Sequence, residues 1–213
     1  MENEFTESQL INLKNNIKDF YYKNKLLFFS ILLLIIIIFS STTFYFHSKK
    51  DKKLMLADLY VKAKIDLLDK KNLEAKKNLI KIIQNNDETY SALSLFLIID
   101  HNLIENDEKI VDLFNHILKN NKFEKEIRNL IIFKKALVQA NFVSEAELIE
   151  NLNPLINSET LWKSHALLLL GDYFHAKGDF LKAKVNYLKI LSLSDVDNLH
   201  EQAKFRLQLS SYE

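Results

Sequence analysis

The side chains with the clearest potential for chemistry in this sequence are its six histidines, two of which lie close to an aspartate. His165, Asp172 and His175 are separated by seven and then three residues. In a helix these intervals place the side chains roughly on one face. Imidazole and carboxylate groups gathered in this way could hold a metal ion or form hydrogen bonds with a peptide. The default interpretation is a solvated face without a ligand.

No other stretch of the sequence carries a catalytic or metal-binding pattern. Cysteine is absent, which excludes disulfides, thiolate zinc sites and thiol nucleophiles. There is no HExxH, no GxSxG and no glycine-rich phosphate loop, and the acidic run from Glu105 to Glu108 lacks the spacing of a calcium loop and is typical of a helix start. We therefore predict no catalytic residue, no metal, no cofactor and no enzymatic activity. The competing hypothesis is an enzyme or metal carrier that uses His165, Asp172 and His175.

Charge makes a nucleic-acid partner an unfavoured hypothesis. The chain has 29 basic and 28 acidic residues, a formal net charge of +1. Proteins that bind nucleic acid usually concentrate their basic residues in a patch. The lysine-rich stretch KNLEAKKNLIK is better explained as the solvated face of a helix. We predict that the partners are proteins and not nucleic acids.

The composition and the spacing of apolar residues predict an all-α fold. With two glycines and one proline among 213 residues, few positions can break a helix. No useful stretch alternates with the period of two that indicates a strand. Ser144 is a predicted helix cap. The expected helices form four pairs and a terminal helix, at residues 54–70 with 73–84, 86–103 with 106–122, 124–140 with 144–156, 162–177 with 180–192, and 198–209.

A long apolar stretch near the N-terminus predicts a single membrane-spanning helix. Residues 26–46 contain no charged side chain and no histidine, and 21 residues of helix extend about 30 Å, the thickness of the hydrocarbon core of a bilayer. A cleaved signal peptide and a buried soluble helix are the alternatives. We assign residues 25–47 to the transmembrane helix, residues 1–24 to a polar tail and residues 48–213 to a helical-repeat domain.

The regions on either side of the span leave the orientation open. Four lysines precede it and four follow it, so the positive-inside rule gives no decision. In the tail, Leu10, Leu13, Ile17 and Phe20 recur at helical spacing, which suggests a short amphipathic helix. That helix could lie on the membrane or meet a partner helix, and a frayed tail is an equal alternative.

The only two glycines of the chain lie seven residues apart, at positions 171 and 178. Glycine inside a helix is less favourable than alanine by about 1 kcal/mol. Gly171 therefore indicates that a second helix crosses there and needs the space of the missing side chain, with Ala183 as the small residue on that helix. Gly178 lies in the predicted turn, where glycine adopts a left-handed backbone without penalty. The alternative is that Gly171 is incidental and Gly178 only caps a helix.

The same residues follow the tetratricopeptide signature, W-x2-L-G-x2-Y and then A-x3-F. Leucine replaces its tryptophan and phenylalanine its tyrosine, while Ile190 and Asp195 stand where a small residue and a proline are usual. A weaker copy earlier in the chain keeps two alanines twelve residues apart. The predicted repeat-packing residues are Leu167, Leu170, Gly171, Phe174, Gly178, Ala183 and Tyr187, with Ala63, Ala75 and Leu79 in the weaker copy.

A short tail, one span and a following region that ends in this signature resemble the bacterial YfgM-like membrane proteins. These are ancillary subunits of the Sec translocon with a tetratricopeptide-like periplasmic domain. The resemblance implies a single-pass protein of the bacterial inner membrane whose C-terminal domain is periplasmic. It also implies contacts with translocon subunits, periplasmic chaperones and exported polypeptides.

We therefore predict a membrane-tethered protein-interaction module, built as a tetratricopeptide-like α-solenoid of about four helix pairs and a terminal helix. In such a solenoid His165, Leu168, Asp172 and His175 line the concave groove and form the candidate partner-binding face. The alternative is a cytoplasm-facing tetratricopeptide scaffold for another membrane complex.

Overall fold

The computed structural model describes residues 7–193 and 197–209, and in them the chain forms ten α-helices and no strand. The predicted all-α class is thereby confirmed. The helices are α1 (Glu7–Lys23), α2 (Lys25–Leu68), α3 (Asn72–Gln84), α4 (Tyr90–Asp100), α5 (Asp107–Asn120), α6 (Lys125–Gln139), α7 (Glu145–Ile156), α8 (Lys163–Ala176), α9 (Phe180–Leu191) and α10 (Asp197–Leu209).

The chain divides into two compact units, Met1–Met55 and Leu56–Glu213. The boundary lies inside α2, which has neither glycine nor proline to interrupt it. The first unit contains α1 and the apolar part of α2. The second unit contains the end of α2 and the helices from α3 to α10.

The apolar part of α2 is exposed along its length. The side chains from Ile31 to Ile38 are each about half exposed. Among the described residues, α2 is the one helix that is long and apolar enough to cross a membrane. Some of its hydroxyl groups are satisfied by the helix itself: Ser30 donates to the carbonyl oxygen of Leu26 at 2.8 Å, and Thr43 donates to that of Phe39 at 3.0 Å. Internal bonds of this kind lower the free-energy penalty of placing a hydroxyl in lipid.

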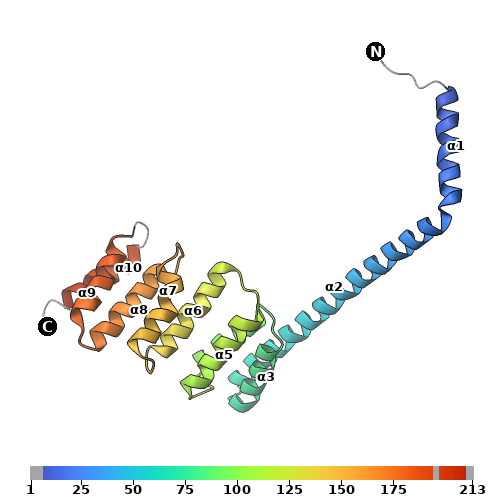
Figure 1. Cartoon of the computed structure of the whole chain (residues 1–213). Helices are drawn as coiled ribbons and strands as arrows, with labels where there is room; N and C mark the ends of the chain where they lie inside the picture. The colour runs from blue at the N-terminus through green and yellow to red at the C-terminus, as the bar shows by residue number, and fades with distance from the viewer. Residues whose placement is uncertain (1–6, 194–196, 210–213) are drawn as a thin grey trace. The chain divides into compact units, whose positions relative to one another are not determined.

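In the second unit, each helix from α3 to α9 packs against the next one in the chain, and α5 to α9 follow one another in chain order (Figure 1), while α10 packs on both α8 and α9. Two apolar clusters form the interior. The first joins the end of α2 to α3, α4 and α5, and the second joins α7 to α10. Helix α6 contributes Ile131 to the first cluster and Ala136 to the second. It therefore links the two cores into one continuous structure.

Turns between the early helices use left-handed residues other than glycine. The φ angles are 62° at Lys70, 56° at Asn86 and 47° at Asn102. Asparagine tolerates this region better than most residues because its short amide can form local hydrogen bonds. The abundance of asparagine thus compensates for the scarcity of glycine in this chain.

Local hydrogen bonds set where several helices begin. Ser144 caps α7 as predicted, and its hydroxyl accepts a hydrogen bond from the Glu147 amide at 3.3 Å. Helix α4 begins at Tyr90, four residues later than its periodicity predicts. The Asp87 carboxylate accepts hydrogen bonds from the amides of Thr89 and Tyr90, at 3.0 and 2.8 Å. These bonds hold residues 87–89 in the turn that leads into α4.

Candidate functional site

The predicted signature lies on α8, α9 and the turn between them, which pack closely. Gly171 lies against the ring of Tyr187. A Cβ atom added to Gly171 would overlap Tyr187 Cε1 and lie 2.7 Å from Cδ1 and 2.9 Å from Cζ. The space of the missing side chain is therefore taken by Tyr187, one turn beyond Ala183, the residue that the sequence suggested would face this glycine. Ala183 is fully buried in the same cluster.

The turn between α8 and α9 has the left-handed backbone that the sequence predicts at Gly178, whose φ is 77°. The next residue, Asp179, caps α9 by accepting a hydrogen bond from the Lys182 amide at 3.1 Å. This backbone hydrogen bond, together with one from the Lys182 side chain, lowers the pKa of the Asp179 carboxyl. The charged cap fixes the point at which α9 begins.

The other predicted repeat-packing residues are in the interior. Leu167, Leu170 and Phe174 of α8 belong to the second cluster. Ala63 and Leu79 belong to the first cluster, and Ala75 is fully buried nearby in the chain. Each residue is thus placed where its side chain can pack a helix pair.

Asp172, a residue of the predicted partner-binding face, is held by internal contacts. Its Oδ1 accepts a hydrogen bond from the Tyr187 hydroxyl at 2.9 Å and another from Arg206 Nε at 2.5 Å. Burial, followed by the bond to Asp172, raises the pKa of the Tyr187 hydroxyl well above its usual range. This carboxylate therefore joins α8, α9 and α10.

His165 lies in an aromatic cluster that joins α8 to α6. Its ring centroid is 5.2 Å from that of Trp162 and 5.7 Å from that of Phe133, and the Trp162 and Phe133 rings stack 5.6 Å apart. Trp162 Nε1 also donates to the carbonyl oxygen of Glu126 at 3.2 Å. The Nδ1 atom of His165 is buried and has no hydrogen-bond partner among the described residues.

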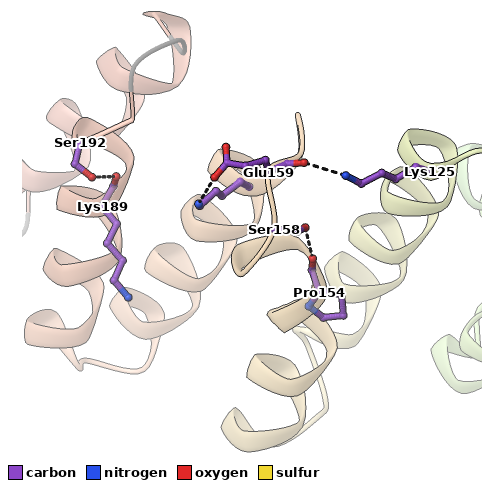
Figure 2. A network of polar contacts seen from close by, with 7 residues as sticks. Lys125, Pro154, Ser158, Glu159, Lys189 and Ser192 are labelled. Atoms are coloured by element: carbon purple, nitrogen blue, oxygen red, sulfur yellow. Dashed lines mark hydrogen bonds and ion pairs between the residues drawn. The ribbon is translucent and has the colours of Figure 1, made fainter.

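The loop between α7 and α8 is held by hydrogen bonds to α6 and to α7. The carbonyl oxygen of Glu159 accepts a hydrogen bond from Lys125 Nζ at 3.2 Å, and the Ser158 hydroxyl donates to the carbonyl oxygen of Pro154 at 2.6 Å (Figure 2). Because Lys125 opens α6 and Pro154 lies near the end of α7, these bonds fix the loop that carries Trp162. The loop thereby positions the aromatic cluster.

His175 lies at the other end of α8, edge-on to Phe180 with 5.2 Å between ring centroids. It borders a small cavity of about 300 Å³ between α8, α9 and α10. Asp172, Phe205, Arg206 and Leu209 also line this cavity. His165 and His175 thus lie in separate side-chain clusters at opposite ends of α8. In the described part of the chain, no group of three histidine, aspartate or glutamate side chains is suited to a metal ion.

A groove that sequence reasoning missed runs between α7 and α9, with its floor on α8. We call it the α7–α9 groove. It encloses about 460 Å³, and its apolar lining is Ile149, Ile156, Leu170, Phe174, Leu181 and Val185. Leu181 is 80% exposed and Val185 is 51% exposed, which is unusual for side chains on a packed helix. The signal was present in the sequence, because Leu181, Val185 and Leu188 form a second apolar stripe on α9.

Lys182 bridges one edge of the α7–α9 groove. Its Nζ is 2.8 Å from a Glu145 carboxylate oxygen and 3.1 Å from one of Asp179, and it lies 5.0 Å from the centre of the Phe174 ring. The hydrogen bond to Glu145, followed by that to Asp179, raises the pKa of the Lys182 amine. Lys189 also lines the groove, so an apolar floor has a mixed-charge rim.

A second and larger groove, of about 760 Å³, lies between α3, α5 and residues 102–106. Its lining combines Ile80, Leu103 and Leu113 with Lys76 and Lys109. Neither groove brings together a nucleophile, a general base and an oxyanion-binding group. Both have the mixture of apolar floor and polar rim that protein interfaces commonly have.

Comparison with protein-family models, with curated proteins and with solved structures finds no match to this chain.

Proposed function

We propose that this protein is a membrane-tethered, non-enzymatic module that binds other proteins through a tetratricopeptide-like helical solenoid. The observation that carries this proposal is the character of α2. Its first part is an exposed apolar helix in which the Ser30 and Thr43 hydroxyls bond to backbone carbonyl oxygens of the same helix. Its last part belongs to the core of the packed unit, so the anchor and the packed unit share one helix.

The pairing of helices supports the repeat architecture. Helix α9 packs on α8 around Gly171 and Tyr187, and α10 packs on both. Helix α6 also contacts α8, two elements further along the chain. Contacts between neighbouring helices and between alternate helices are what a stack of helical hairpins requires, because each hairpin buries its apolar face against the next.

The open grooves of the packed unit support protein binding. The α7–α9 groove presents apolar side chains to solvent beside charged ones, and a tethered surface meets membrane partners at a raised effective concentration. Leu168 and His165 on α8 remain partly exposed. The predicted partner-binding face is therefore a second candidate contact surface, although Asp172 is engaged internally.

The resemblance to YfgM-like proteins leads us to propose the Sec translocon, periplasmic chaperones and exported polypeptides as partners. We test this by photo-crosslinking in native membranes. The full chain carries a photoreactive amino acid at Val185 in the α7–α9 groove or at Leu168 on the α8 face, with Glu201 on α10 as the control position. Recovery of translocon subunits from position 185 or 168, and not from 201, is the expected result. Consistent recovery of a different membrane complex would replace these partners.

The alternative is a scaffold with the same fold whose packed unit faces the cytoplasm. It would also bind proteins, so the two differ in the side of the membrane on which the packed unit lies. Because the chain has no cysteine, one introduced cysteine is a unique reporter of sidedness. We expect Lys177→Cys to react with a membrane-impermeant maleimide in cells whose outer membrane has been permeabilised. Reaction only after the inner membrane is lysed would assign the packed unit to the cytoplasm.

A further inference from the structure

The apolar face of α1 is largely exposed in the part of the helix whose side chains the structure describes. Leu13 is 48% exposed, Ile17 64% and Phe20 61%. At helical spacing these three side chains and Tyr21 share one stripe of α1. A stripe of this kind is normally covered by another surface, because exposed apolar area is unfavourable in water.

The position of α1 in the chain identifies the surface that covers it. Helix α1 ends at Lys23 and α2 begins at Lys25, so Asn24 alone separates them. The apolar stretch of α2 begins immediately afterwards, at Leu26. One residue spans less than about 4 Å. If α2 crosses a bilayer, the last turn of α1 must therefore lie at the edge of the hydrocarbon.

The charges of α1 exclude insertion across the membrane and fit the headgroup region. Residues 13–25 contain four lysines and one aspartate. Lys14 and Lys18 flank the apolar stripe on one side, and Lys23 lies on the other side. Charged residues are unfavourable in the bilayer centre, whereas a basic amphipathic helix binds with its apolar face in the headgroup boundary and its lysines near anionic lipid.

We propose that α1 is an interfacial helix that lies on the membrane surface, with Leu13, Ile17 and Phe20 in the lipid and its lysines against anionic headgroups. This inference rests on the proposed membrane anchoring of α2. The inference goes beyond that anchoring, because α1 becomes a second lipid contact that restricts how α2 can rotate and tilt.

The test uses single-cysteine variants of the full chain, each labelled with an environment-sensitive fluorophore and reconstituted into vesicles. Ile17→Cys reports on the apolar stripe, and Asn15→Cys reports on the opposite side of α1. Ile35→Cys reports on the centre of the apolar stretch of α2. The vesicles contain phosphatidylcholine with phosphatidylglycerol, or phosphatidylcholine alone, and include lipids with a nitroxide quencher at a known depth.

We expect quenching by a shallow nitroxide to be about threefold stronger at position 17 than at position 15, and to weaken at position 17 when phosphatidylglycerol is omitted. Strong quenching at position 35 by a deep nitroxide is expected throughout. Equal quenching at positions 15 and 17, with position 35 still quenched by the deep nitroxide, would overturn the interfacial placement of α1 and leave the membrane anchoring of α2 in place. A water-exposed position 35 would overturn both. Energy transfer between copies at position 17, in place of lipid quenching, would assign the stripe to self-association and refute a lipid contact.

Discussion

Replacing Gly171 by alanine tests whether the contact with Tyr187 is the reason for a glycine in the middle of α8. The added Cβ atom would lie 2.7 Å from Tyr187 Cδ1 and 2.9 Å from Cζ, distances at which one of the two groups must move. The ring has little freedom to do so. Tyr187 is 1% exposed, and Asp172 holds its hydroxyl at 2.9 Å.

The expected change in the free energy of unfolding follows from three contributions. Alanine is a better helix former than glycine and stabilises α8 by about 1 kcal/mol. Overpacking a well-filled core destabilises by about 1–3 kcal/mol. A shift of the ring that breaks its bond to Asp172 adds about 1 kcal/mol, the net contribution of a typical hydrogen bond. With the helix gain subtracted, Gly171→Ala should destabilise the second cluster by about 2 kcal/mol.

A double-mutant cycle with Tyr187→Leu isolates the contact. Leucine lacks Cε1 and Cζ, two of the three atoms nearest to the added methyl group, and its flexible side chain can turn aside. Gly171→Ala should then stabilise the protein by about 1 kcal/mol through helix propensity. The coupling energy between the two positions is therefore expected to be about 3 kcal/mol. The sign of the Gly171→Ala effect should reverse between the two backgrounds.

The measurement is urea unfolding of the full chain in mild detergent, followed by the fluorescence of the single tryptophan, Trp162, which packs against the second cluster. Gly178→Ala is the matched control. It has a φ of 77° and no atom within 4 Å of an added Cβ, so its loss of about 1 kcal/mol should be the same in both backgrounds. If Gly171→Ala destabilises equally with and without the Tyr187 ring, close packing does not explain this glycine.

Three further predictions use the same protein. The free energy of unfolding should fall as the pH rises above 10.0, the ordinary pKa of a tyrosine, because ionisation of Tyr187 favours the unfolded chain. In urea titrations between about pH 8 and about pH 11, Tyr187→Phe should flatten this fall. An unchanged slope in the variant would contradict the prediction. His165→Phe keeps the aromatic packing and removes a buried nitrogen without a hydrogen-bond partner, so it should raise the free energy of unfolding by about 1 kcal/mol. A decrease in the free energy of unfolding by the same amount would mean that this nitrogen is hydrogen-bonded in solution. Lysine at both Ile35 and Ile36 opposes insertion by about 3 kcal/mol each, so that variant should be released from membranes by alkaline washing, whereas Ser48→Lys, beyond the apolar stretch, should remain.

The helices were predictable because their apolar residues recur with the helical period and few residues can interrupt them. Their ends depend on single hydrogen bonds, and these are harder to foresee. Ser144 was identified because it directly precedes an acidic helix start. The turn held by Asp87 is not predicted from the sequence, because its residues also fit the periodicity of α4. The turns at Asn86 and Asn102 carry no glycine to mark them, although each has a positive φ.

The residues of the candidate face all lie on α8, but their surroundings could not be inferred from spacing within that helix. Phe133 and Arg206, which engage His165 and Asp172, are 32 and 34 residues away from them in the chain. One compositional signal was available. The chain has only two arginines, and both bind internal acceptors, Arg206 at Asp172 and Arg128 at the carbonyl oxygen of Leu118. Arginine suits such fixed contacts because its planar guanidinium presents its donors in a rigid geometry.

The engagement of Asp172 also determines what the surfaces of α8 and α9 can recognise. With its carboxylate bonded to Arg206, Asp172 offers no free negative charge to a cationic ligand, and the adjoining cavity is walled by Phe205 and Leu209. The α7–α9 groove likewise has an apolar floor, with charge only at its rim. Interfaces gain most of their free energy from apolar side chains buried at the centre, while rim charges mainly direct association. Both surfaces are therefore better suited to the apolar side chains of a protein segment than to a charged small molecule, and salt should change the rate of association more than the strength of binding.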